Sequence, residues 1–151
     1  MLFRSKLKHF LEVLQFPPDK GAARWHVAGG AHPALFLGID HTAITVADTD
    51  RSVAFYRDAF NLRVVGESLN EGIEQERLSG VRGARVRITA LRGDAGPGVE
   101  LLEYLEPRDG RPGSPDASAT DLAFWQIVFL SGRTAVPSDP DLHAVLSLDP
   151  R

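Results

Sequence analysis

The sequence predicts an α+β fold in which one strand, one helix and three further strands follow one another between about residues 38 and 105. Two observations predict it. β-Branched and apolar residues recur with the alternation of strands in short segments, and one segment between the first two of these has apolar residues at helical spacing. The chain of 151 residues is 43% hydrophobic, so it has the length of one domain and can bury a core.

The first strand is predicted at residues 39–46, where the residue types become β-branched. Because successive side chains of a strand point to opposite faces, this strand has two different sides. One side carries His41 near the start of the strand, and the other is apolar. The first side consists of Ile39, His41, Ala43 and Thr45, and the second contains Ile44 and Val46.

The helix is predicted at about residues 49–60. Asp48 and Asp50 supply the carboxylates that are favoured around a helix N-terminus. Asn61 stands where the helix must end, and Asn is the commonest residue other than Gly in the left-handed conformation that ends helices. The apolar stripe at i, i+3 and i+7 is Val53, Tyr56 and Phe60.

Three strands are predicted to follow, at residues 62–68, 84–92 and 99–105, with a Gly- and Pro-rich turn at residues 93–98. The last strand again has two different faces. Its apolar face should pack on the helix, which leaves Glu100 on the opposite, open face and favours Glu100 over Glu103 as a candidate site residue. The apolar face is Val99, Leu101 and Leu105, and the other is Glu100, Leu102 and Tyr104.

The segments on either side of this core have a different composition. Residues 2–16 carry apolar residues at helical spacing before Pro17 and Pro18, which predicts an amphipathic helix, and residues 19–33 indicate a linker. The helix should pack on its own domain or on a partner subunit; peripheral attachment to a membrane is the alternative. We therefore divide the chain into residues 1–36, 37–106 and 107–151.

The third of these parts begins with a Pro-, Gly-, Asp- and Ser-rich linker that ends near residue 120. One more strand is predicted at residues 124–130. The residues after Leu130 include three prolines and show no helical pattern, and they support no structural prediction.

Composition excludes several classes of function. A net charge of -3 with scattered charges provides no basic stripe, which argues against a nucleic-acid partner. There is no cysteine, so disulfides, thiolate nucleophiles and Cys-ligated zinc are excluded and any metal must be held by His and carboxylates. Charged residues interrupt each apolar run before the roughly 18 residues of a membrane span. We expect a cytoplasmic protein.

The stretch Ile39-Asp-His-Thr-Ala-Ile-Thr-Val-Ala-Asp, followed by Asp50-Arg-Ser-Val-Ala-Phe-Tyr-Arg-Asp-Ala-Phe-Asn-Leu, resembles the opening of vicinal oxygen chelate proteins, the glyoxalase, bleomycin-resistance and extradiol dioxygenase type. Gly98-Val-Glu-Leu-Leu-Glu-Tyr-Leu is similar to the family's fourth strand, which carries a metal-binding carboxylate. The resemblance covers about residues 38–105 and implies the βαβββ module of that family.

The resemblance also implies a site. Two such modules enclose a cavity that holds a divalent metal, with one His and one carboxylate from each module. Carried over to this chain, the ligands are His41 and Glu100, and this donor pair suits Zn²⁺, Ni²⁺, Mn²⁺ or Fe²⁺. Glu100 is also the candidate base for a glyoxalase-like proton transfer, and Tyr104 is placed to orient the substrate.

The second half of the sequence departs from the family pattern. Where another His is expected, the register places either Phe124, which cannot bind a metal, or Gln126, which could offer its carbonyl oxygen as a weaker ligand. About twenty residues follow Leu130, whereas a helix and three strands need roughly fifty or more. The sequence therefore predicts a truncated second module, and a homodimer that covers the open sheet and completes shared sites.

Three functions remain open at this point. The first is metal-dependent lyase, isomerase or dioxygenase chemistry on a small oxygenated substrate, with the metal as Lewis acid. The second is metal-free binding of an aromatic or cationic small molecule, as in bleomycin-resistance proteins, with Phe124, Trp125 and Tyr104 as stacking surfaces. The third is an inactive half-module. Arg85 and Arg87 clamp a substrate carboxylate if their face lines the cavity; otherwise they are solvated or pair with acids such as Glu74 and Glu76.

Overall fold

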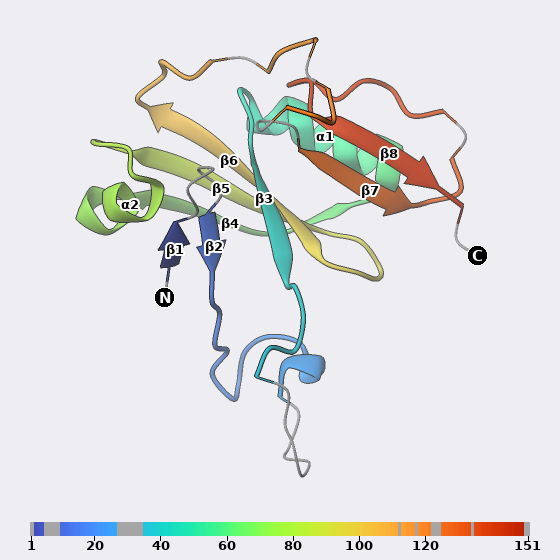
Figure 1. The fold of residues 1–151 in the computed structure, drawn as a ribbon. Coiled ribbons are helices and arrows are strands. Elements are labelled where there is room, and N and C mark those ends of the chain that lie inside the picture. The colour runs from blue at the N-terminus through green and yellow to red at the C-terminus, as the bar shows by residue number, and fades with distance from the viewer. Residues whose placement is uncertain are drawn as a thin grey trace. The chain divides into compact units, whose positions relative to one another are not determined.

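The computed structural model describes residues 2–4, 10–26, 35–111, 113–116, 118–121, 125–133 and 135–149. The chain divides into two compact units, residues 1–40 and 41–151, and each is described by itself (Figure 1). Among the described residues, no helix combines the length and the apolar character that a membrane span requires.

The described residues of the first unit contain two short strands, β1 (Leu2–Arg4) and β2 (Phe10–Glu12), which pair antiparallel. The predicted amphipathic helix at residues 2–16 is therefore wrong at these positions. A helix of about 12–15 residues is marginal in water without a surface to pack on. Leu11 is 62% exposed, so the apolar stripe that was expected to drive the helix is not buried at this position.

Trp25 organises the rest of the first unit. It ends the short 3₁₀ helix η1 (Ala23–Trp25), stacks on Phe16 with ring centroids 6.4 Å apart, and donates a 3.0 Å hydrogen bond from Nε1 to Oδ1 of Asp40. Alternation in the first predicted strand puts Asp40 on the face opposite His41, which predicts a surface residue rather than a metal ligand. Its carboxylate accepts the indole hydrogen bond at the end of this unit.

The second unit is built on a four-stranded sheet with the order β3-β6-β5-β4 (Figure 1). β3 and β6 pair parallel, and the other neighbouring strands pair antiparallel. This arrangement confirms the predicted α+β fold and its βαβββ order. The elements are β3 (His41–Thr45), α1 (Thr49–Phe60), β4 (Arg63–Glu71), α2 (Gly72–Ser79), β5 (Arg85–Arg92) and β6 (Gly98–Glu106).

Helix α1 has the ends that the sequence predicts. The side chain of Asp48 is the N-cap and accepts a 2.9 Å hydrogen bond from the backbone N–H of Arg51. Asn61 ends the helix in the left-handed conformation, with φ of 56°. Both caps satisfy backbone groups that the helix itself cannot pair.

Helix α2 was not predicted. Its eight residues include only two large apolar ones, of which Ile73 is 59% exposed, and only Gln75 is buried, so it lacks the apolar periodicity that reveals a helix in a sequence. Gly80 ends α2 with φ of 67°. α2 inserts one short helix between the second and third strands of the module.

The core of the second unit lies between one face of the sheet and α1. Tyr56 and Leu101 are fully buried there. Ile44, Val46, Leu91 and Val99 complete the sheet's contribution. Because alternate residues of a strand share a face, the buried residues of each strand all lie on the helix side. Burying one side chain of this size stabilises the fold by roughly 1.5–3 kcal/mol.

Two further strands lie over α1, β7 (Gln126–Leu130) and β8 (Ala144–Leu148), and they form a parallel pair (Figure 1). Ile127 belongs to the core, and the ring of Phe129 stacks on Phe60 with centroids 3.9 Å apart. β7 was predicted and β8 was not. After β6 the described residues contain only these two strands and no helix, so the second module is incomplete within them, in agreement with the prediction.

The segment of residues 139–143, which precedes β8, is tied to α1, and we call it the anchor segment. Its Asp139 is 4% exposed and accepts hydrogen bonds from the Tyr56 hydroxyl (2.8 Å), the His143 ring (2.7 Å) and the backbone N–H groups of Asp141 and His143. The guanidinium of Arg51 also donates to the carbonyl of Pro140. This network holds the C-terminal strands against the module.

The anchor segment shifts the pKa values of its members. Burial and the Asp139 carboxylate raise the pKa of Tyr56. Burial alone would raise the pKa of Asp139, but the hydrogen bonds from His143, Tyr56 and the backbone outweigh it and leave that pKa lowered. Burial alone would lower the pKa of His143, but Asp139, Asp141 and a backbone hydrogen bond with Thr45 outweigh it and raise that pKa. The segment is therefore held by a carboxylate and an imidazole that favour their charged forms.

Candidate functional site

His41 and Glu100 meet on the open face of the sheet. The parallel register of β3 and β6 pairs His41 with Gly98 and Ala43 with Glu100, so the two side chains project from adjacent strands on the same face. Nε2 of His41 lies 3.4 Å from Oε2 of Glu100, and the side chains are 18% and 26% exposed. An imidazole and a carboxylate are thus brought together where solvent can reach them.

The opposite face of the same two strands explains this placement. Ile44 of β3 and Leu101 of β6 are 4% and 0% exposed against α1. Because alternate residues of a strand point to opposite faces, burying this apolar set turns His41 and Glu100 away from the helix. The structure confirms the faces predicted for both strands.

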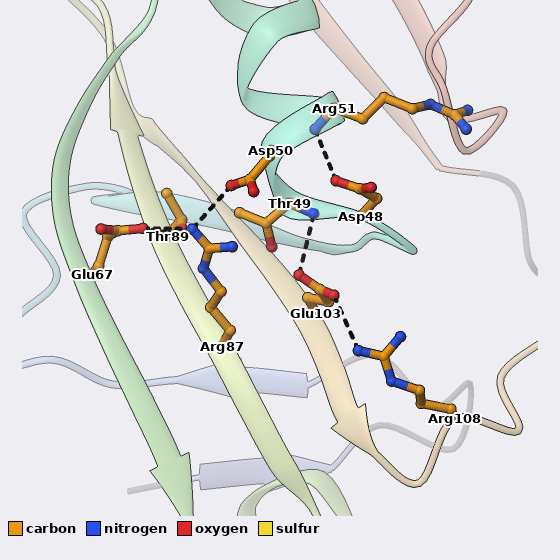
Figure 2. Close-up of polar contacts among 9 residues, drawn as sticks. All are labelled: Asp48, Thr49, Asp50, Arg51, Glu67, Arg87, Thr89, Glu103 and Arg108. Carbon is orange, nitrogen blue, oxygen red and sulfur yellow. Dashed lines mark hydrogen bonds and ion pairs between the residues drawn. The ribbon is translucent and has the colours of Figure 1, made fainter.

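Glu103 has a different position, which Figure 2 shows. It lies on the helix side of β6, where Oε2 accepts a 3.2 Å hydrogen bond from the backbone N–H of Thr49 and Oε1 lies 3.7 Å from Arg108. A carboxylate at a helix N-terminus satisfies an otherwise unpaired N–H and interacts favourably with the helix dipole. Glu103 therefore supports α1, and Glu100 is the β6 carboxylate that lies beside His41.

Of the two alternatives left open for Arg85 and Arg87, the structure shows pairing with acids and not a carboxylate clamp. Arg87 lies on the helix side of β5, with Nη2 3.0 Å from both Asp50 and Glu67 (Figure 2), and Arg85 pairs with Glu71 at 3.2 Å. The hydrogen bond to Glu67 raises the pKa of Arg87. Partial burial opposes this shift, and the contact with Asp50 adds to it. The arginines do pair with acids, but not with the Glu74 and Glu76 that we had named.

Arg92 at the end of β5 is the residue that the sequence reasoning missed. A Cβ on Gly98 would lie 3.2 Å from both Cζ and Nε of Arg92, so the guanidinium lies across this glycine. Gly98 pairs with His41, which brings Arg92 close to the His41–Glu100 pair. Strand alternation puts Arg92 on the face opposite Arg87, which was the only signal in the sequence. Alternation alone does not predict that β5 lies next to β6.

The remaining candidates are more scattered. Tyr104 is half-buried on β6 and lies on the same face as Glu100. Gln126 is exposed at the start of β7, in the separate two-stranded sheet. Their roles in orienting substrate and in weak ligation stay predictions. Trp125 is 42% exposed, and Phe124 lies outside the described residues.

The other histidines have no ligand spacing with one another in the sequence, which predicts surface positions for them. This is wrong for His143, whose side chain is 18% exposed and belongs to the anchor segment. It holds for His26, which is exposed and forms a 2.6 Å hydrogen bond between Nε2 and the carbonyl of Lys20. His9 and His32 lie outside the described residues.

The donor set of the His41–Glu100 pair suits a divalent metal in kind, because imidazole nitrogen and carboxylate oxygen are ligands of Zn²⁺, Ni²⁺, Mn²⁺ and Fe²⁺. The number of donors is small. The described part of the chain contains no group of three or more His, Cys, Asp or Glu side chains that could hold a metal ion. Because metal sites in enzymes usually have three protein ligands, the pair fits as part of a site.

Comparison with known proteins places this geometry in a family. The model of the Glyoxalase/Bleomycin resistance protein/Dioxygenase superfamily matches residues 38–143, which is more than half of the chain. The chain belongs to this superfamily. The vicinal oxygen chelate resemblance seen in the sequence is thereby confirmed, and the matched residues of this glyoxalase superfamily member include both His41 and Glu100.

A solved structure supports the fold. The chain is similar to a glyoxalase family protein from Bacillus cereus with a TM-score of 0.53 and 22% identity, over 68% of this chain and 66% of that chain. The match thus spans slightly less than two thirds of that protein's length. No match to a curated protein was found. At this identity the likeness to the solved structure establishes the fold alone.

Proposed function

We propose that this glyoxalase superfamily member binds a divalent metal through His41 and Glu100 and acts on a small oxygenated substrate by lyase, isomerase or dioxygenase-type chemistry. One observation carries the proposal: Nε2 of His41 and Oε2 of Glu100 lie 3.4 Å apart on the open face of the sheet. A histidine and a carboxylate at this separation can bind one ion together. When bound, the metal would supply Lewis-acid stabilisation of negative charge on substrate oxygens.

A second copy of the chain would complete the site. Two donors from one chain fall short of the usual three, and the exposed part of the sheet face around the pair needs a cover. In a two-fold dimer each copy presents the same surface, so a shared site would have two histidines and two carboxylates. The described residues contain one βαβββ module to take part in this pairing.

Different residues of the chain would then have different roles in the reaction. Glu100 is the group that would take a proton from the substrate, because it is the carboxylate on the open face. Tyr104 lies four residues after Glu100 on β6 and on the same face. It would orient the substrate through its hydroxyl or its ring. Ala43 and Leu102 add apolar groups beside the pair on the same face.

A metal-free binding protein is the second candidate, with an inactive half-module as its limiting case. The observation that favours it is the small number of donors: the described residues provide no group of three His, Cys, Asp or Glu. Trp125, at 42% exposure, and Tyr104 would then provide stacking surfaces for an aromatic or cationic molecule.

Native mass spectrometry after incubation with Zn²⁺, Ni²⁺, Mn²⁺ or Fe²⁺ separates these candidates, because it reports oligomer and metal together. We expect a dimer with stoichiometric metal that is lost in His41→Ala and in Glu100→Gln. Glu103→Gln is the matched control, since it changes a carboxylate of the same strand on the opposite face, and it should keep the metal. A metal-free protein under all four conditions would reject the proposal and leave the binding protein or the half-module.

A further inference from the structure

Arg92 lies on the same face of the sheet as the His41–Glu100 pair. In the antiparallel register of β5 and β6, Ala90 is opposite Glu100, and opposite residues share a face. Arg92 is two residues beyond Ala90 on β5, so its side chain emerges on that face as well. The three residues therefore come from the adjacent strands β3, β6 and β5.

Gly98 opens the space that the Arg92 side chain occupies. A Cβ at this position would lie 3.2 Å from Cζ and Nε of Arg92 and 3.0 Å from the carbonyl oxygen of Leu91, and any larger group would displace the guanidinium. Gly98 is also the partner of His41 in the parallel register. The guanidinium thus lies over Gly98 on β6, the strand next to the one that carries His41.

The chemistry of this position suits an anion. A guanidinium is charged at all physiological pH values and has five N–H donors in a planar fork that matches the two oxygens of a carboxylate. Because it has several donors, it can bind a ligand oxygen while it keeps contacts with protein groups. Ala90 adds only a methyl group between Arg92 and Glu100, so a small ligand can reach from one to the other.

We infer that Arg92 is the anion-recognition residue of this site and that the substrates are small oxygenated carboxylates, such as 2-oxo or 2-hydroxy acids. Their carboxylate binds the guanidinium, and their neighbouring oxygen is directed toward His41 and Glu100. This inference rests on the proposed function. It also assigns to Arg92 the carboxylate-binding role that the sequence had suggested for Arg85 and Arg87.

The test compares two chelators on the metal-loaded protein by calorimetric titration. Oxalate offers adjacent oxygens and a free carboxylate edge, and acetohydroxamate offers adjacent oxygens without a carboxylate. We expect Arg92→Met to raise the Kd of oxalate by about 10- to 100-fold, as for the loss of a charge-assisted bidentate contact, and to change the Kd of acetohydroxamate by less than about 3-fold.

Two further variants separate geometry from charge. Arg92→Lys keeps the charge without the planar fork, so it should recover only part of the oxalate affinity. Arg63→Met removes an equal charge from the neighbouring edge strand, where Arg63 pairs with Asp94 at 2.8 Å, and it should leave both chelators unaffected. A similar loss of oxalate affinity in Arg63→Met and Arg92→Met would overturn the inference, because it would indicate a general charge effect.

The remaining outcomes distinguish the inference from the function on which it rests. If wild type binds acetohydroxamate but not oxalate, or if Arg92→Met weakens both chelators equally, the anion-recognition role is rejected and the metal site stands. If wild type binds neither chelator and holds no metal, the proposed function fails and the inference fails with it.

Discussion

The hydroxyl of Tyr56 donates a 2.8 Å hydrogen bond to Oδ2 of Asp139, a residue 83 positions away in the chain. Tyr56 is fully buried in α1, and Asp139 is 4% exposed in the anchor segment. The bond therefore joins the first helix of the module to the last strands of the chain inside the core, where losing the donor leaves Oδ2 of a buried carboxylate without this hydrogen bond.

Replacing Tyr56 by Phe tests this link. Because the acceptor is a buried carboxylate, we expect Tyr56→Phe to lower the free energy of unfolding by roughly 1.5–3 kcal/mol in urea denaturation. Tyr104→Phe removes a hydroxyl from the half-buried tyrosine on β6 and serves as the control, with an expected change below about 0.5 kcal/mol. Equal effects of the two substitutions would show that the Tyr56–Asp139 bond has no special contribution.

The anchor segment also predicts a pH dependence. The pKa of His143 is raised in the folded protein, because its contacts with Asp139, Asp141 and Thr45 outweigh burial. Its contribution to stability is therefore full below the unfolded pKa of about 6.5 and is lost as the pH rises through the higher folded pKa. The pKa of Asp139 is lowered, so its contribution is full above about 3.9 and is lost as the pH falls through the lower folded value.

We therefore expect the stability difference between wild type and His143→Gln to be largest between about pH 4 and 6.5 and to shrink at higher pH. Denaturant titrations across the pH range measure it. His26→Gln is the control, because His26 is exposed and bonds only a nearby carbonyl. A difference for His143→Gln that is constant from pH 5 to pH 9 would contradict the role of its charged form.

Thr49, the first residue of α1, provides a prediction of the opposite sign. It is fully buried, and its Oγ1 has no hydrogen-bond partner among the described residues. A buried hydroxyl without a partner costs roughly 1–3 kcal/mol, so Thr49→Val, which keeps the shape, should raise the free energy of unfolding by about 1 kcal/mol. Thr49→Ser keeps the hydroxyl and should not stabilise. If thermal and urea unfolding show a destabilised Thr49→Val, an additional partner must satisfy the hydroxyl.

Asn61 tests the end of α1. With φ of 56° it occupies the left-handed region, where a Cβ costs roughly 1–2 kcal/mol unless the side chain is Asn or absent. We expect Asn61→Ala to lose about 1 kcal/mol and Asn61→Gly to stay within about 0.5 kcal/mol of wild type. The comparison of the two variants by urea denaturation isolates the backbone term. An Ala variant as stable as the Gly variant would mean that the helix end relaxes to another conformation.

Local patterns determined much of the module. Alternation decided which face of β3 and β6 is apolar, and Asp48, Asp50 and Asn61 marked the two ends of α1. These features depend on neighbouring residues, whose side-chain directions follow from the backbone alone. The sequence therefore placed His41 and Glu100 on corresponding faces and separated Glu100 from Glu103.

Segments whose structure depends on distant contacts were predicted poorly. α2 has almost no apolar face, and β8 is an isolated short apolar run whose pairing with β7 appears only in the fold. The strands β1 and β2 replaced an expected helix, because a short amphipathic pattern is stable only on a surface that it can cover.

The sequence by itself determined the family, the module order and the two residues at the centre of the candidate site. Only the tertiary structure decided that β3 pairs with β6, which brings Nε2 of His41 to 3.4 Å from Oε2 of Glu100, and that β5 lies next to β6, which lays Arg92 across Gly98. The physical reason is that strand order is set by long-range backbone hydrogen bonds and by burial against α1, and neither is written in the periodicity of any one segment.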